Sequence, residues 1–243
     1  MAEKSNGTPA PLKNVAFFME MMERLQGRAS HMEGIGCFYG EPGLGKSISA
    51  RFALLQFQAY YIEAGKSWTA KALFTRILRE MGITPAKTIW EMTEQAGNQL
   101  LLSGRPLIID EFDKLVDKGL AEHVRELYLA SKGKATIIVV GEESLPFKLK
   151  KTPRFYDRVL TWYRARPADG EDVKNLHHFY QGEVTIHADM LNTIAEASGG
   201  VVRRVCNALE TIENWSKLSG VKEIGLSEWG DQPLFTCDPD LGR

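Results

Sequence analysis

Apolar side chains follow two different periods along the chain. Between positions 15 and 27 they recur every three or four residues, which predicts an amphipathic helix that ends near Gly27. Downstream, short apolar runs of the kind that form buried strands alternate with stretches of helical period. The runs are IGCFY (35–39), AYYIE (59–63), PLIID (106–110), ATIIVVG (135–141) and DRVLTWY (157–163).

Helical stretches separate these five runs and predict the fold class. They are SARFALLQF (49–57), TAKALFTRILREMG (69–82) and AEHVRELYLASKG (121–133). Strands that alternate with helices build a parallel sheet with helices on both faces. We therefore expect an α/β fold around a five-stranded parallel sheet.

The pattern changes near RARPADGED (164–172), where Pro167 and Gly170 interrupt it. From there to about Gly220 the period is helical, which predicts a smaller helical domain. The predicted organisation is a flexible leader at 1–12, an α/β domain at 13–167, a helical domain at 168–221 and a tail at 222–243.

Composition narrows the possible partners and the compartment. The 243 residues carry 30 basic and 31 acidic side chains, so any contact with nucleic acid must come from a local basic region. No apolar run reaches the roughly 18 residues of a membrane span, and the first residues do not resemble a secretory signal. Three widely spaced cysteines fit a reducing compartment. We expect a cytoplasmic protein with no membrane partner.

The segment GEPGLGKS after the first strand run carries the clearest chemistry. Gly40, Gly45, Lys46 and Ser47 match the pattern G-x-x-x-x-G-K-[ST], with a strand before it and a helix after it. Such a loop turns its N–H groups toward phosphates, the lysine reaches the β- and γ-phosphates, and the hydroxyl ligates magnesium. The predicted nucleotide-binding residues are Gly40, Glu41, Pro42, Gly43, Leu44, Gly45, Lys46, Ser47 and Ile48.

A second acidic motif ends the third apolar run, at Asp110 and Glu111 in PLIIDEFDKL. Two carboxylates at the end of a buried strand are costly unless they serve a cation or a reaction. We expect Asp110 to hold Mg²⁺ together with Ser47. Glu111 is then the base that orients and polarises the attacking water.

These motifs, the five-stranded core and the helical segment after it resemble the AAA+ ATPases over about residues 15–219. The resemblance implies a sheet order of 5-1-4-3-2, a helical lid, and the cofactors ATP and Mg²⁺. It also implies an arginine finger, for which Arg158 or the nearby Arg154 is the candidate, acting in its own site or a neighbouring subunit's. A second sensor arginine is expected at Arg203, with Arg204 as the alternative.

One departure from that family lies at the end of the fourth apolar run. Gly141 and Glu142 stand where many members carry Asn, Ser or Thr as the first sensor. We therefore expect slow hydrolysis that DNA and a partner stimulate.

Several sequence segments, among them LIIDEFDKL and GGVVRRVCNALE, resemble those of the transposition branch of the AAA+ proteins, which includes Mu-like phage B proteins. That branch implies sequence-independent binding of double-stranded DNA, self-assembly into a ring or helical filament, and delivery of the DNA to a transposase in a bacterial host. The candidate DNA contacts are Lys66, Arg79 and Lys87. A second basic run, KLKKTPRFYDR (148–158), fits DNA or a subunit contact.

Two other functions share the same motifs. One is an ATPase of a secretion or assembly apparatus, and the other is a helicase loader. A duplex-binding measurement with and without ATP separates them from the transposition reading.

Overall fold

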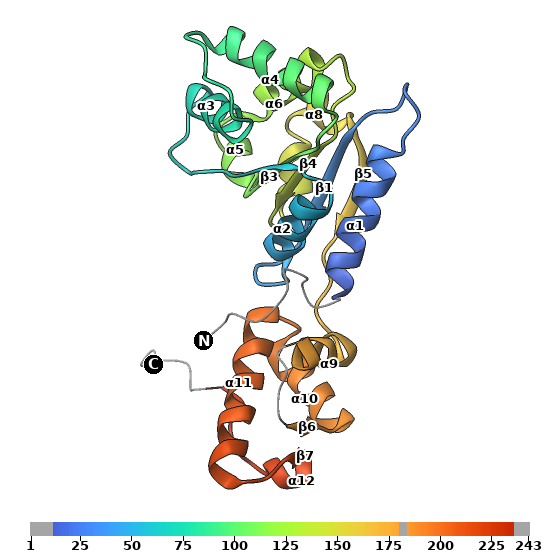
Figure 1. The fold of residues 1–243 in the computed structure, drawn as a ribbon, viewed down its shortest axis with the longest axis vertical. Coiled ribbons are helices and arrows are strands. Elements are labelled where there is room, and N and C mark those ends of the chain that lie inside the picture. The colour runs from blue at the N-terminus through green and yellow to red at the C-terminus, as the bar shows by residue number, and fades with distance from the viewer. Residues whose placement is uncertain (1–11, 180–183, 236–243) are drawn as a thin grey trace. The chain divides into compact units, whose positions relative to one another are not determined.

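The computed structural model describes residues 12–179 and 184–235 (Figure 1). Most of the predicted leader and the end of the predicted tail, including Cys237, lie outside the described residues. Contacts divide the chain into two units. The larger comprises Val15–Glu41 and Lys46–Ala165, and the smaller comprises Pro42–Gly45 with the described parts of Met1–Asn14 and Arg166–Arg243. The domain limits expected from the sequence stay predictions.

A five-stranded parallel sheet forms the centre of the larger unit. Its order is β2-β3-β4-β1-β5, which confirms the expected α/β class and strand order. The strands are β1 (Ile35–Tyr39), β2 (Tyr60–Glu63), β3 (Leu107–Asp110), β4 (Ile137–Gly141) and β5 (Val159–Arg164).

The register brings the carboxyl ends of the central strands to one edge. Tyr39, the last residue of β1, is paired with Gly141, the last residue of β4. Ile109 of β3 is paired with Val139 of β4, so Asp110 also reaches this edge. Parallel α/β sheets bind ligands at this edge.

Successive side chains of each strand point to opposite faces of the sheet, and both faces are buried under helices. On one face, Cys37 and Val139 belong to a buried core with side chains of the helices that follow β2 and β3. On the other, Phe38 packs against Phe18 of α1 (Lys13–Gln26), with ring centroids 5.1 Å apart. Because both faces are buried, the strands appear in the sequence as continuous apolar runs rather than alternating ones.

Helices connect the strands of the larger unit, and several were not predicted. The expected helices are present as α2 (Lys46–Gln56), α3 (Ala70–Glu80) and α6 (Ala121–Ala130). The additional ones are α4 (Ile89–Ser103), α5 (Asp113–Val116), α7 (Leu145–Leu149) and α8 (Pro153–Tyr156). A capping box between Thr88 and Glu91 begins α4, and this sequence signal could have revealed it.

The smaller unit is helical but contains two short strands. Its helices are α9 (Gly170–Phe179), α10 (Ala188–Ser198), α11 (Val202–Ser219) and α12 (Leu226–Trp229). The strands β6 (Thr185–Ile186) and β7 (Glu223–Ile224) pair in parallel. The sequence predicted neither strand, because two residues give no readable period.

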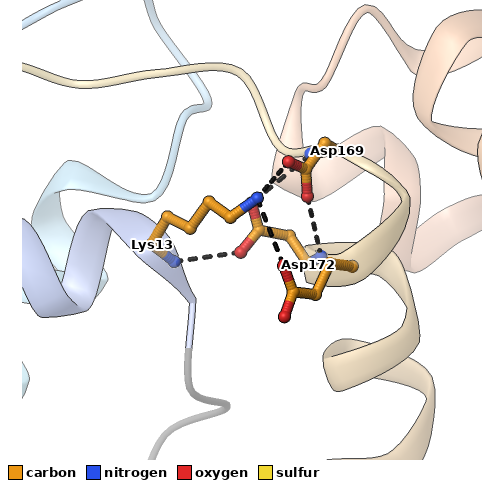
Figure 2. A network of polar contacts seen from close by, with 4 residues as sticks. Lys13, Asp169 and Asp172 are labelled. Carbon is orange, nitrogen blue, oxygen red and sulfur yellow. Dashed lines mark hydrogen bonds and ion pairs between the residues drawn. The ribbon is translucent and has the colours of Figure 1, made fainter.

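A polar network in the smaller unit joins the first turn of α1 to the start of α9 (Figure 2). The Lys13 N–H donates to Asp172 at 2.9 Å, and the Lys13 ammonium group pairs with Asp169 and with Glu171. Asp169 and Asp172 each accept the other's backbone N–H. The hydrogen bond from Lys13 holds the pKa of Asp169 below its usual value, while burial raises the pKa of Asp172.

Among residues 12–179 and 184–235, no helix combines the length and the apolar character needed to cross a bilayer.

A close approach of α4 to α6 gives a test of the packing. A Cβ atom at Gly97 would lie 2.5 Å from the Ala130 Cβ and 2.8 Å from the Ala130 carbonyl carbon. Gly97→Leu should therefore lower the free energy of unfolding by about 1–3 kcal/mol through overpacking. Denaturant unfolding measures this change. Asn98→Ala, at the exposed next position, is the control, and equal stabilities of the two variants would contradict the packing described.

Candidate nucleotide-binding site

The loop from Gly40 to Gly45 joins β1 to α2 at the carboxyl edge of the sheet. The Gly40 N–H donates to the Gly141 carbonyl at 3.3 Å, which ties the start of the loop to the end of β4. Gly43 and Gly45 both have φ of 83°, a left-handed conformation that favours glycine. The shape of the loop thus requires glycine at positions 43 and 45. The helix that starts at Lys46 directs its first N–H groups toward the loop.

Lys46 folds back over this loop. Its Nζ donates to the carbonyl oxygens of Gly40 and Glu41, both at 2.7 Å. Burial lowers the pKa of Lys46, and the carboxylates Asp110 and Glu111 oppose that shift. The ammonium group therefore lies among acceptors, where a phosphate oxygen can replace a carbonyl.

The apex of the loop is held by two contacts within the smaller unit. Asn14 Nδ2 donates to the Leu44 carbonyl and to the Arg166 carbonyl, each at 2.8 Å, and Asn14 Oδ1 accepts the Arg166 N–H. The Val202 N–H, at the start of α11, donates to the Gly43 carbonyl at 3.0 Å. The sequence did not reveal Asn14, because its partners are 30 and 152 positions away.

Asp110 has the surroundings expected of a cation ligand. It is 3% exposed, Oδ2 accepts a hydrogen bond from the Tyr61 hydroxyl and Oδ1 accepts one from the Glu111 N–H, both at 2.8 Å. Burial and this carboxylate raise the pKa of Tyr61. Ser47 is half-buried in the first turn of α2.

These oxygen donors fit magnesium. Within the described residues no three or more His, Cys, Asp or Glu side chains form a cluster that could hold a metal. Mg²⁺ differs from most protein-bound metals in this respect, because one or two carboxylates, waters and substrate phosphates suffice for it. Asp110 and Ser47 could supply the protein's share of such a site.

Glu111 has an unusual backbone. Its φ of 56° is left-handed, which is uncommon in a residue with a side chain, and such strain concentrates at functional sites. Its carboxylate is partly exposed and lies 3.3 Å from Lys114 Nζ. The assigned role of Glu111 as base stays a prediction.

A third carboxylate near this edge, Asp113, was not predicted from the sequence. It is 4% exposed, and its Oδ2 accepts the Glu142 N–H at 2.6 Å. Burial raises the pKa of Asp113. The sequence gives one weak signal for it, which is its position three residues after Asp110 at the start of a helix.

Arg158 does not join this group of residues within one chain. It precedes β5, at the amino end of the strands, where it pairs with Glu33 at 2.6 Å. Arg154, in α8, is exposed. Either arginine as a finger for another subunit stays a prediction.

Arg203 lies one residue beyond the Val202 N–H that contacts the loop, in the first turn of α11. Arg203 and Arg204 are both exposed. The connection from Gly43 to Val202 brings the start of α11 to the loop, and the choice between the two arginines stays open.

Lys66, Arg79 and Lys87 are exposed, and none forms a salt bridge with another described residue. Lys66 precedes α3 and Arg79 lies in its last turn. Lys87 lies in the segment that precedes α4. The three residues thus lie before α3, at its end and before α4.

The phosphate loop, the acidic strand end and the strand order together define a P-loop NTPase core of the AAA+ type. A family model described as an AAA domain matches residues 29–149. No curated protein sequence matches the chain.

Solved structures share the fold at low identity. The Aeropyrum pernix ORC2 protein in its ADP form has a TM-score of 0.66 and 15% identity over 92% of this chain and 69% of its own. The A. pernix ORC1 protein in complex with DNA has a TM-score of 0.64 and 14% identity, over 89% and 64%. The Thermotoga maritima RuvB Holliday junction branch migration motor has a TM-score of 0.58 and 17% identity, over 88% and 66%.

These matches show the fold, and the chain spans about two thirds of each of those structures.

Asn14 gives the test of how the loop is held. Asn14→Ala would remove the donor to the buried Leu44 carbonyl and to the partly buried Arg166 carbonyl, at a cost of about 1–3 kcal/mol. We expect lower stability and weaker nucleotide binding, measured by thermal unfolding and by titration with a fluorescent ATP analogue. Asn207→Ala, at an exposed position of α11, should change neither. Unchanged affinity in Asn14→Ala would show that the loop does not need this contact.

Proposed function

We propose that the protein is a Mg²⁺-dependent ATPase that binds double-stranded DNA without sequence preference, self-associates on it and presents it to a transposase. The observation that carries the ATPase part is the loop itself. Left-handed glycines shape it, the Lys46 ammonium group lies among acceptors inside it, and the buried Asp110 is at the adjoining edge of the sheet.

In this proposal the residues divide the work of hydrolysis. The N–H groups of residues 40–48 and Lys46 bind the phosphates, and Ser47 and Asp110 hold Mg²⁺, which neutralises phosphate charge when bound. Glu111 accepts a hydrogen bond from the attacking water and orients it. Arg203 contacts the γ-phosphate, and Arg158 or Arg154 of a neighbouring copy stabilises the charge that develops in the transition state.

DNA binding is supported by Lys66, Arg79 and Lys87, which are exposed and form no salt bridge within the described part of the chain. It is also supported by the fold shared with an ORC1 protein solved in complex with DNA and with a Holliday junction motor. These neighbours favour DNA over the envelope partner of a secretion ATPase. The transposase role rests on the motif resemblance alone, in the cytoplasm of a bacterial host.

Two substitutions separate binding from hydrolysis. Lys46→Ala removes the phosphate-binding ammonium group and should weaken ATP binding by at least about 30-fold. Glu111→Gln should keep ATP affinity, lower turnover by about 10²–10⁴-fold and accumulate an ATP-bound assembly. Calorimetry, phosphate release and light scattering measure the three effects.

Lys71→Ala and Glu126→Gln, at exposed helix positions, are the matched controls. Turnover by Glu111→Gln at the wild-type rate would refute the role of Glu111 as base. Tight ATP binding by Lys46→Ala would refute the site.

The DNA hypothesis predicts ATP-dependent binding to a random-sequence duplex that weakens steeply with salt, measured by anisotropy with ATP, with ADP and without nucleotide. Loss of one phosphate contact makes the negative slope of log K against log salt shallower by about 0.9. Lys66→Ala, Arg79→Ala and Lys87→Ala should each do so, whereas the exposed Lys118→Ala should not. No binding in any nucleotide state would refute the DNA function and leave the ATPase assignment intact.

The transposase role is tested in a strand-transfer reaction with a Mu-like transposase, with and without ATP. Stimulation supports it, and a complex with a replicative helicase instead would favour the helicase loader.

A further inference from the structure

Gly141, the last residue of β4, has no room for a side chain. A Cβ atom there would lie 2.1 Å from Asp113 Oδ2 and 2.6 Å from Leu145 Cδ2. The backbone of Gly141 does not require glycine, because it is absent from the positions with positive φ among the described residues. The side chains of Asp113 and Leu145, rather than the conformation of the chain, therefore leave no room for a side chain at the end of β4.

Asp113 connects the ends of three neighbouring strands. It follows β3 by three positions, and its Oδ2 accepts the N–H of Glu142, directly after β4, at 2.6 Å. The carbonyl of Gly141 accepts the N–H of Gly40, directly after β1, at 3.3 Å. One carboxylate thus aligns the acidic strand end with the start of the phosphate loop.

The second oxygen of this carboxylate is poorly satisfied. Asp113 Oδ1 is buried and has no hydrogen-bond partner among the described residues, and the nearest cation, Lys148 Nζ, is 3.7 Å away. Lys148 itself is closer to Asp117, at 2.9 Å. A buried acceptor without a hydrogen bond costs about 1–3 kcal/mol. An unsatisfied carboxylate oxygen in this position lowers the stability of the fold, and a functional role would explain why it is present.

We propose that Asp113 is a positioning residue for nucleotide hydrolysis, which supplies from α5 the polar group that Gly141 cannot supply at the end of β4. The inference rests on the proposed ATPase function. β4 lies between β1, which leads into the phosphate loop, and β3, which ends at Asp110. The hydrogen bond between Asp113 and the Glu142 N–H therefore sets how phosphates bound in the loop are aligned with Asp110 and Glu111. ATP affinity depends on the loop itself, and Asp113 therefore acts on turnover.

The first test is Asp113→Asn, which keeps the shape of the side chain but replaces the charged acceptor of the Glu142 N–H by a neutral amide oxygen, so that the hydrogen bond between the strand ends is weakened. We expect kcat to fall by at least about tenfold, while KM and the Kd for ATP stay within about twofold. Asp117→Asn is the matched control, since it removes the other carboxylate partner of Lys148 on the exposed surface, and it should hydrolyse ATP at nearly the wild-type rate.

Stability provides a readout that a merely structural role would move the other way. Burial raises the pKa of Asp113, so the ionised carboxylate destabilises the fold at neutral pH, and this effect disappears as the pH falls and the group is protonated. The charged groups that act on it are Lys148 and Glu142, and it acts in turn on Cys37 and Lys46. Asp113→Asn should melt at or above the wild-type temperature at neutral pH, and its advantage should shrink in acid.

A reciprocal exchange tests the placement of the polar group. Gly141→Asn alone should lose stability, because the new side chain meets Asp113 and Leu145. Asp113→Gly alone should lose turnover. The double variant Asp113→Gly with Gly141→Asn removes the contact with Asp113, leaves only that with the end of the Leu145 side chain, and restores a polar group to the end of β4. Its kcat should therefore exceed that of Asp113→Gly by about tenfold.

The outcomes are distinguishable. A wild-type protein without ATPase activity overturns both the proposed function and this inference. An active wild type together with an equally active Asp113→Asn overturns the positioning role alone. Parallel loss of ATP affinity and melting temperature in Asp113→Asn also overturns it, because Asp113 would then be structural.

Discussion

The half-buried ammonium group of Lys46 faces several carboxylates at the carboxyl edge of the sheet. The carboxylates of Asp110, Glu111, Asp113 and Glu142 all act on Lys46, and burial of Lys46 opposes them. In the proposed function, a triphosphate adds further negative charge to the same edge. Binding of ATP would therefore require further positive charge at this edge. The oxygen donors beside the loop could hold Mg²⁺ for this purpose, and arginines from other segments are expected to supply the rest.

The sequence predicted the parts of the fold that depend on local pattern. Buried parallel strands are continuous apolar runs, so β1, β3 and β4 were clear, and the glycines of the loop were clear because their backbone angles demand glycine. Helix α4 was missed, although its capping box was visible in the sequence. The short strands β6 and β7 carry no readable period and form only because their partners meet in space.

The residues of the site that belong to a motif of fixed spacing could be predicted from the sequence. The residues that contact the site from distant segments could not. Nothing in the sequence marks Asn14 as the residue that holds the loop. Charge pattern was equally ambiguous in the basic run 148–158. Within it, Lys148 pairs with Asp117 and Arg158 pairs with Glu33, whereas Arg154 stays exposed. Only the partners distinguish a structural cation from one that is available to a ligand or another subunit.

The close fit between Gly141 and Asp113 has an evolutionary consequence. A side chain at position 141 is excluded while a carboxylate occupies the space beside it, and loss of that carboxylate leaves the strand ends without their tie. Changes at the two positions are therefore expected to be coupled. A lineage that gains a polar residue at position 141 is expected to pass first through a smaller residue at position 113, because the reverse order places the new side chain against the Asp113 carboxylate.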